Sequence, residues 1–425
     1  MSIISWPFAP VVGRRSRASW VLGLAIAAGP AVAAAQEPSP AEGTLGDSAA
    51  GPGGTFAGPG NLLSGLRDRG IHPKLGSITD GSGATPGLVL WRPDLGGSGV
   101  DLFLSAGRSF REYGLVELRV GRVPHRAGEP PSRRERLEDG SPLAEPRDGR
   151  RLFYYADVRY RDLPVERFFG LGSGSRLADG TSYSLRDASY DVVTGWRFGG
   201  RVAASVRAGL VRTDLGYSDD AALPPVGNHF STALAPGLSG GTDFLRVAPE
   251  LVLDGRDDPT APRRGSFLSV GAARWSARGR QRHSFTRLGV DARRYQPLGS
   301  PRHVLAFRAT ASWSLAGGGG EVPFYLQDTL GGSRSLRGYP TFRFRGERLL
   351  AASGEYRFQV TRALEAAAFY DGGHVSAAAD AMDSGFVSGY GLGLRVRVPG
   401  GPLVRVDVGR GAEGSRVHLN VGYAF

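Results

Sequence analysis

The chain has 425 residues with 65 glycines, 28 prolines and no cysteine, and 41% of the residues are hydrophobic. Its 52 Lys and Arg residues exceed its 40 Asp and Glu residues by 52 − 40 = 12, but Lys74 is the only lysine, and arginine is scattered through the whole sequence. These counts exclude a disulfide framework and a cysteine nucleophile, disfavour a helical bundle because glycine weakens helices, and do not indicate a nucleic-acid binder.

Residues 1–35 are predicted to be a secretory signal peptide. Three arginines precede an apolar run that ends at Ala33-Ala34-Ala35, and a basic start, an apolar middle and small residues before the cleavage site are what export requires. We expect cleavage after Ala35, which leaves a net charge of 12 − 3 = +9. The alternative is an N-terminal membrane anchor, but Gly29 and Pro30 interrupt the apolar run.

Residues 36–85 are predicted to be a flexible periplasmic segment. They are rich in Gly, Pro, Ser and Ala, include Gly51-Pro52-Gly53-Gly54, and show no sustained apolar period. Beyond the signal we find no run of eighteen apolar residues, so no helix is predicted to cross a bilayer. An exported chain without an anchor is either soluble or a β-barrel, because only helices and closed barrels satisfy every backbone group in lipid.

Alternation with a period of two begins clearly at His303 and recurs to the end of the chain. In the first such stretch the apolar positions are Leu305, Phe307, Ala309, Ala311, Trp313 and Leu315. Between Leu350 and Val360 one face carries Ala, Gly, Tyr and Phe, which leaves Glu355 on the opposite, inward face. On the next stretch Leu364 to Tyr370 alternate in the same way, so Asp371 also points inward.

The last three stretches form a predicted hairpin and a final strand. From Phe386 onward apolar side chains alternate with glycine and arginine, at Tyr390, Leu392, Leu394, Val396 and Val398. After the turn Pro399-Gly400-Gly401-Pro402 the apolar positions are Val404, Val406 and Val408, and in the final stretch they are Val417, Leu419, Val421, Tyr423 and Phe425.

The length of these stretches distinguishes a barrel from a soluble sandwich. A sandwich also alternates, but its strands usually have about five or six residues and their outward face is polar. Here the stretches run for about nine to eleven residues, which is the length that tilted transmembrane strands need. The apolar face would contact lipid, and the Gly- and Arg-rich face would line the lumen. We therefore expect residues 86–425 to form a transmembrane antiparallel β-barrel.

Several motifs in this region resemble, in the same order, those of the BamA/TamA superfamily of outer-membrane proteins, also called bacterial surface antigens. They are Arg167-Phe168-Phe169-Gly170-Leu171-Gly172, Asp254-Gly255-Arg256-Asp257-Asp258-Pro259 with Pro262-Arg263-Arg264-Gly265, the strand from Phe285 to Tyr295, Leu336-Arg337-Gly338-Tyr339, and Phe369-Tyr370-Asp371-Gly372-Gly373. The resemblance implies an all-β fold of 16 strands in the outer membrane of a Gram-negative cell.

In this family the long extracellular loop between the eleventh and twelfth strands folds back into the lumen, where its motif arginine docks on carboxylates of the wall. The resemblance makes Arg337 the docking residue and Glu355 and Asp371 its acceptors. An arginine suits this task because its guanidinium can bond two carboxylate oxygens at once. Gly338 would allow close backbone approach, and Tyr339 would wedge against the wall. The alternative is that Arg337 is an exposed loop residue.

The two ends of the chain carry further expectations from the resemblance. Tyr423 and Phe425 resemble the C-terminal signal that the barrel-assembly machinery reads, although the usual glycine is shifted, with Gly422 near the end and Asn420 in its place. Family members that insert or secrete proteins carry periplasmic POTRA modules. The 36–85 segment is too short for a packed module of this kind, so a separate periplasmic protein is an expected partner.

No catalytic constellation is evident in the sequence, and no enzymatic activity, cofactor or nucleic-acid partner is expected. The seven His are dispersed without a His-Glu-x-x-His element, and the carboxylates Asp254, Asp257 and Asp258 lack the spacing of a calcium-binding EF-hand loop. Two functions remain open. The barrel aids insertion or translocation of proteins or lipids at the outer membrane, or it is a passive pore or structural barrel with a plugging loop. Outer-membrane lipids are expected partners of the barrel, and a basic exterior loop would contact the anionic lipopolysaccharide.

Overall fold

The computed structural model describes most of the chain from residue 70 onward. The described residues are 70–79, 81–124, 151–218, 220, 222–259, 261–279, 281–377, 385–397, 403–421 and 423–425. The predicted signal peptide, most of the predicted 36–85 segment and the predicted turn at 399–402 lie outside these residues.

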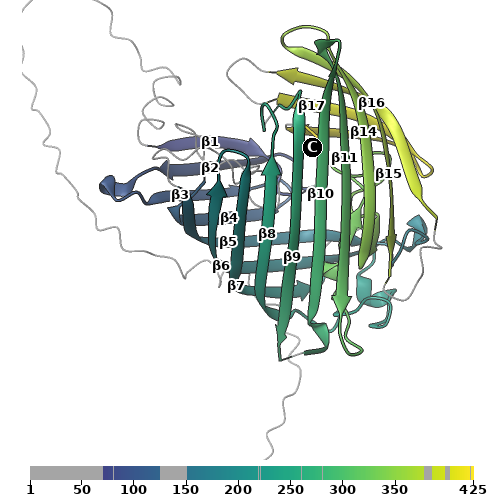
Figure 1. Ribbon diagram of the computed structural model, residues 1–425. Helices are drawn as coiled ribbons and strands as arrows, with labels where there is room; N and C mark the ends of the chain where they lie inside the picture. Colours follow the sequence, from purple (N-terminus) through teal and green to yellow (C-terminus); the bar gives the residue numbers. More distant parts are fainter. Residues whose placement is uncertain are drawn as a thin grey trace, which may run out of the picture. The chain divides into compact units, whose positions relative to one another are not determined.

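The described chain forms one antiparallel sheet of 16 strands, in which neighbouring strands follow one another in chain order apart from β12 and β13. Figure 1 shows this succession from β1, in purple, to the yellow strands of the C-terminal part. The first eight strands are β1 (Ile71–Gly76), β2 (Thr85–Arg92), β3 (Asp101–Arg108), β4 (Gly114–Arg122), β5 (Leu152–Phe168), β6 (Thr181–Phe198), β7 (Val202–Gly216) and β8 (Asp243–Asp254). The others are β9 (Gly265–Arg278), β10 (Phe285–Leu298), β11 (Ser300–Ala316), β14 (Arg348–Gln359), β15 (Leu364–Ser376), β16 (Val387–Arg397), β17 (Leu403–Gly411) and β18 (Gly414–Val421). The predicted all-β antiparallel barrel of 16 strands is confirmed.

The remaining elements are short and lie in the connections. β12 (Asp328–Leu330) pairs with β13 (Phe344–Gly346) in a small separate sheet within the connection from β11 to β14. Single turns of 3-10 helix occur at Leu95–Gly97, Leu177–Asp179, Val226–Asn228, Gln281–His283 and Phe324–Leu326. Within the described residues, no helix has the length and apolar character needed to cross a membrane.

The sheet begins earlier in the chain than the sequence predicts. β1 lies inside the segment expected to be a linker, and it pairs with β2 from Ile71↔Leu90 to Gly76↔Thr85. The alternation of β1 is obscured by Pro73, which central strands exclude because proline cannot donate to the ladder. β1 is an edge strand of the sheet, where proline is tolerated, so its pairing with β2 overrides a weak local pattern.

The two faces of the sheet differ as expected for a barrel in lipid. On β16 the apolar residues at even positions are 44–68% exposed, whereas Arg395, between two of them, is fully buried. On β14 Tyr356 is 39% exposed and Glu355 is buried. The apolar side chains therefore face outward to the bilayer and the charged ones face inward, which is the arrangement of outer-membrane barrels.

Candidate functional site

Residues 317–347, which we call the docking loop, connect β11 to β14 and pack on the inner face of the barrel wall. The β12–β13 pairing holds the two arms of the loop together, and Gly331 and Gly332 adopt positive φ values of 122° and 88° where the first arm turns. Apolar side chains from both arms form one buried cluster with the wall; it comprises Leu330, Leu336, Tyr339, Phe344, Ala351 and Val375. This cluster places the predicted motif Arg337-Gly338-Tyr339 against strands β14 to β18.

Arg337 is 1% exposed and contacts both carboxylates that the sequence singles out. Its Nε and Nη2 donate to Asp371 Oδ2 and Oδ1, each at 2.7 Å, and its Nη1 donates to Glu355 Oε2 at 2.7 Å. The backbone amide of Arg337 also donates to Asp371 Oδ2, at 3.1 Å. The guanidinium lies over the ring of Phe369, 3.4 Å from its centroid. Arg337 is therefore held on every side by β14 and β15 rather than exposed.

The electrostatics of this contact favour the charged forms of its members. Burial lowers the pKa of Arg337, but its hydrogen bond to Asp371 and the negative charges of Asp371 and Glu355 outweigh that effect and raise the pKa above its ordinary value. Arg337 is thus a permanent cation. Charge-assisted bonds of this kind are about twice as strong as neutral ones, so the docked position is specified by charge as well as by shape.

Glu355 connects Arg337 to a larger network on the inner wall. Its Oε1 accepts from Arg357 Nε at 2.6 Å, and Arg395 Nη2 lies 2.7 Å from Oε2. Asp407 on β17 lies 4.0 Å from Arg337 Nη1 and 3.2 Å from Arg405 Nε. The sequence pattern placed Arg395 and Arg405 on the inward face, but it gave no indication that they belong to the site of the docking loop.

Glycines of β17 allow the backbone of the loop to lie directly on the wall. A Cβ at Gly409 would stand 2.5 Å from the Arg337 carbonyl oxygen, and a Cβ at Gly338 would stand 2.5 Å from the Gly411 amide nitrogen. Neither distance is possible for a real side chain without displacement. Tyr339 packs its ring on Gly411, donates its hydroxyl to Ser388 O at 3.2 Å and accepts from Ala412 N at 3.1 Å. Sequence reasoning anticipated a role for Gly338 but not for Gly409 and Gly411.

His418 ties the docking loop to the last strand of the sheet. Its Nε2 donates to the carbonyl oxygen of Arg337 at 2.8 Å, and on β17 Arg405 Nη2 donates to Ser333 O at 3.0 Å. His418 belongs to the polar face of β18, so its inward direction follows from alternation. Its partner could not be found from sequence, because the two residues are 81 positions apart.

Arg343 and Arg345 anchor the returning arm of the docking loop. Arg343 Nε donates to Glu413, in the turn between β17 and β18, at 2.8 Å, and its Nη1 donates to Ser175 Oγ at 2.8 Å. The carbonyl of Arg345 accepts from the amide of Gly172, also at 2.8 Å. The predicted segment Arg167 to Gly172 therefore ends against the docking loop, and the loop bridges the β5–β6 connection to the end of the sheet.

Alternation predicts that Tyr423 and Phe425 continue the lipid-facing side of the final strand. In the structure they do not. The ladder of β18 ends at Val421, where its partner on β17 is Val404. Phe425 is buried with Tyr295, Val304 and Ala306, and Arg357 lies over the rings of Tyr423 and Phe425, at 4.5 and 5.5 Å. Without a further strand partner, the tail gains apolar and cation–π contacts inside the wall instead of remaining in the ladder.

The carboxylates at the end of β8 and in the turn that follows stabilise that turn. Asp254 pairs with Arg256, with 2.7 Å between Oδ2 and Nη2, and Asp257 Oδ1 accepts the amides of Asp258, Arg263 and Arg264. Among the described residues, no group of three or more His, Asp or Glu side chains is placed to hold a metal ion.

The chain matches a family model described as the Omp85 superfamily domain over residues 148–425. Among solved structures it is similar to BamA from Haemophilus ducreyi lacking POTRA domains 1–3, with a TM-score of 0.57 and 14% identity over 85% of this chain and 76% of that one. It is also similar to CdiB from Escherichia coli, with a TM-score of 0.53 and 15% identity over 83% of this chain. This chain covers 62% of the CdiB chain, which is less than two thirds of its length. At these identities the likeness shows the fold.

Proposed function

Because this chain belongs to the Omp85 superfamily and is a barrel of the outer membrane, we propose that it aids the insertion or translocation of proteins or lipids at that membrane. In this proposal the docking loop controls the seam between the first and last strands. Arg337 holds the loop in the docked position, and Glu355 and Asp371 are its acceptors on the wall.

The observation that supports this proposal is the contact of one loop with all of the last five strands. Arg337 binds β14 and β15 through Glu355 and Asp371, and its carbonyl binds β18 through His418. Tyr339 binds β16 through Ser388, and Gly338 rests on β17. Within the described residues, no ladder pairs β18 with β1. A loop bound to the last five strands couples its own release to movement of the terminal strand.

The proposal also assigns partners to the protein and roles to the two ends of its chain. Residues 1–35 direct export and are removed, and the segment that follows leads to β1 and meets a periplasmic protein that supplies POTRA modules. Tyr423 and Phe425 serve as the signal for the barrel-assembly machinery before they enter the lumen. Cross-linking from residues 36–69 in cells would identify the periplasmic partner.

Depletion of the protein is expected to lower the amounts of other outer-membrane proteins, or of lipids exposed on the cell surface, before growth stops. Quantitative proteomics and lipid analysis of isolated outer membranes would measure this. Wild-type protein supplied from a plasmid should restore both, and the Arg337→Ala variant should restore neither. An unchanged outer-membrane proteome and lipid content after full depletion would contradict the proposal.

A passive or structural barrel is the second candidate, and one feature of the loops favours it. Side chains from the connections at one end of the sheet form a buried apolar cluster with the docking loop, which includes Ile78, Tyr113, Val226, Ala235 and Phe324. Such packing of the connections against the docking loop is what a plugging loop requires. In planar bilayers we expect low conductance for the wild type and larger, fluctuating conductance for Arg337→Ala. Large and steady conductance in both proteins would favour the passive pore.

A further inference from the structure

A rim of exposed arginines lies at the end of the barrel opposite the docking loop. Connections alternate between the two ends of an antiparallel sheet, so the turns that join β6 to β7, β8 to β9 and β14 to β15 all lie at this end. In the proposed function this end faces the periplasm. The exposed arginines in these connections and at the neighbouring strand ends, which we call the basic rim, are Arg92, Arg151, Arg201, Arg264, Arg302, Arg362 and Arg397.

The basic rim differs from the loop end of the barrel in the pairing of its charges. At the loop end several exposed arginines pair with carboxylates, in Arg176–Asp179, Arg186–Asp162, Arg212–Asp243 and Arg282–Glu321. Among the described residues, no side chain of the basic rim makes a hydrogen bond or an ion pair. Its guanidinium groups therefore keep their donors for a partner outside the barrel.

The acidic residues at this end do not neutralise the basic rim. Asp94 accepts the amide of Gly99 at 2.6 Å, and Asp257 accepts three amides of its own turn. Residues 125–150 of the β4–β5 connection lie outside the described residues, and their six arginines and six acidic residues cancel, 6 − 6 = 0. The basic rim therefore keeps a positive charge, and such a field attracts and orients an acidic surface.

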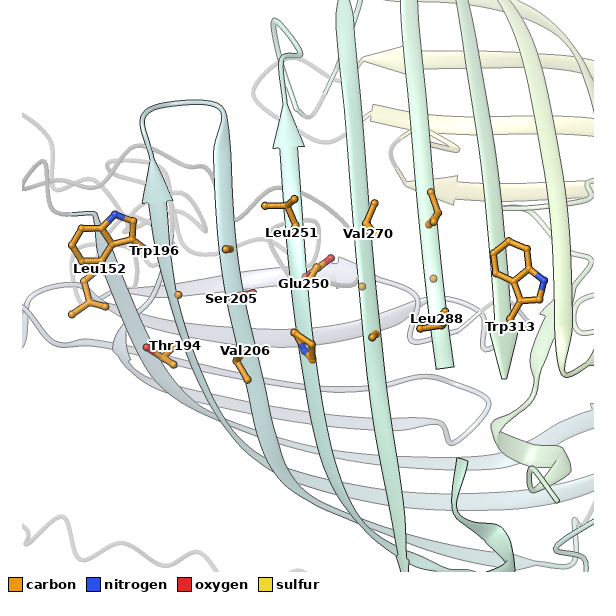
Figure 2. A pocket seen from close by; sticks show the side chains of 17 residues that line it. Leu152, Thr194, Trp196, Ser205, Val206, Glu250, Leu251, Val270, Leu288 and Trp313 are labelled. Atoms are coloured by element: carbon orange, nitrogen blue, oxygen red, sulfur yellow. The ribbon is translucent and has the colours of Figure 1, made fainter. Parts of the chain in front are cut away.

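Arg151 points to the lumen side of the basic rim. Its carbonyl accepts the amide of Arg197 at 2.9 Å, so it continues the β5–β6 ladder. The next pair of that ladder, Leu152 and Trp196, lines an apolar outward surface together with Val206, Leu251 and Val270 (Figure 2). Because successive side chains of a strand point to opposite faces, Arg151 lies on the face turned away from the bilayer.

Arg397 and Arg362 meet at another part of the same rim. Arg397 continues the inward face of β16, two positions after the buried Arg395. Its amide donates to the carbonyl of Ala363 at 2.8 Å, which places it beside Arg362 in the β14–β15 turn. Lipid head groups surround the outside of a barrel, so inward arginines at its mouth fit a macromolecule that covers this end.

The extent of the basic rim also fits a macromolecule. It runs from β2 to β16, which is twelve strand intervals or about 58 Å along the wall at roughly 4.8 Å per interval. A small folded domain about 30 Å across can contact several of these arginines at once. One lipid head group cannot.

We propose that the basic rim, through Arg151, Arg362 and Arg397, binds an acidic surface of a periplasmic protein. This contact rests on the proposed function, in which a periplasmic protein meets the barrel, and it adds the chemistry of the surface that meets it. Guanidinium groups bond carboxylates in bidentate pairs, which fixes the orientation of the partner. Exposed pairs are screened by salt, so the association weakens as the ionic strength rises.

Titration with an acidic probe tests the chemistry of the basic rim. The barrel is placed in phosphatidylcholine nanodiscs, which leave both of its ends open to solvent, and a fluorescent oligo-glutamate peptide is added. The triple variant Arg151→Gln, Arg362→Gln, Arg397→Gln should bind the peptide about tenfold more weakly, as expected for three exposed ion pairs of ordinary strength. The control variant Arg108→Gln, Arg278→Gln, Arg410→Gln removes exposed arginines of the loop end and should change binding little. Equal losses in the two variants would overturn the proposal.

Photo-cross-linking in cells identifies what the basic rim binds. Benzoylphenylalanine is placed at Gly200, beside Arg201, and in a matched control at Gly317 of the loop end; a Cβ at either glycine meets no atom within 4 Å. At Gly200 we expect a protein adduct whose linked segment contains more Asp and Glu than Lys and Arg. The adduct should disappear in the triple variant and persist in the control variant. Circular dichroism first establishes that both variants are folded.

Several results of the cross-linking would overturn the proposal. Phospholipid adducts in place of protein would show that the basic rim holds head groups. Protein adducts that persist in the triple variant, or whose linked segments are not acidic, would remove the arginine contact, and so would the absence of any adduct specific to Gly200.

Depletion of the protein separates this contact from the proposed function. If the adduct depends on the arginines while depletion leaves the outer-membrane proteome and lipids unchanged, the contact stands and the assembly function fails. If depletion has its expected effect while the adduct does not depend on the arginines, the assembly function stands and the contact fails.

Discussion

Replacing Arg337 by alanine is expected to release the docking loop from the wall without unfolding the barrel. The substitution removes the bidentate partner of Asp371, a carboxylate with no measurable exposure. Removing one partner of a buried ion pair typically costs about 3–5 kcal/mol, because the remaining charge is left uncompensated. Glu355 keeps Arg357 and Arg395, so the cost falls mainly on Asp371. The ladders of the 16 strands do not involve Arg337, which is why the barrel should persist.

Limited proteolysis of the protein in vesicles would measure this release. Cleavage within residues 317–347 should become much faster in Arg337→Ala, while the far-ultraviolet circular dichroism of the barrel should not change. Arg334→Ala is the matched control, since Arg334 lies in the same loop with an exposed side chain. Equal cleavage rates in the wild type and Arg337→Ala would show that the loop does not depend on this arginine.

Gly409→Ala is expected to displace the docking loop although its sequence is unchanged. The added methyl group would stand 2.5 Å from the Arg337 carbonyl oxygen, a backbone atom that cannot turn away. Overpacking of this kind costs about 1–3 kcal/mol. Displacement would also lengthen the bond from His418 Nε2 to the Arg337 carbonyl, so the last strand should loosen together with the loop.

The loosening of β18 can be followed by hydrogen exchange of peptides from residues 414–421. These peptides and the docking loop should both exchange faster in Gly409→Ala than in the wild type. Gly289→Ala is the control, because a Cβ at this inward position of β10 meets no atom within 4 Å. Faster exchange in the loop alone, with β18 unaffected, would mean that the loop and the terminal strand are not coupled.

Alternation predicts the architecture and the inward direction of two carboxylates, and the family resemblance adds Arg337 as their partner. The period of two placed Glu355 and Asp371 inward, because each lies between outward apolar residues, and both bond Arg337 in the structure. The family suggested by the motifs is confirmed by the Omp85 superfamily match over residues 148–425. Local patterns predict these features well because strand periodicity determines the face of the sheet on which each side chain lies. That face determines which charged side chains point into the lumen.

The contacts that complete the site join residues that are far apart in the sequence. A local pattern cannot predict such pairs. His418, Gly409 and Glu413 approach the loop because β17 and β18 lie against it, which the sequence does not specify. Alternation also predicted the wrong side for Phe425, since period-two reasoning holds only while a strand has a partner. The opposite error occurred at β1, where pairing with β2 stabilises a strand with a weak pattern of its own.

The central claim is that the docking loop is held on the wall through Arg337, and hydrogen exchange at one amide tests it most directly. The Arg337 amide donates to Asp371 Oδ2 and is buried with its side chain. In wild-type protein in a bilayer, this amide is predicted to exchange far more slowly than an unstructured one, and Asp371→Ala should remove that protection. Rapid exchange of the Arg337 amide in the wild type, at the rate of an unfolded peptide, would contradict the account.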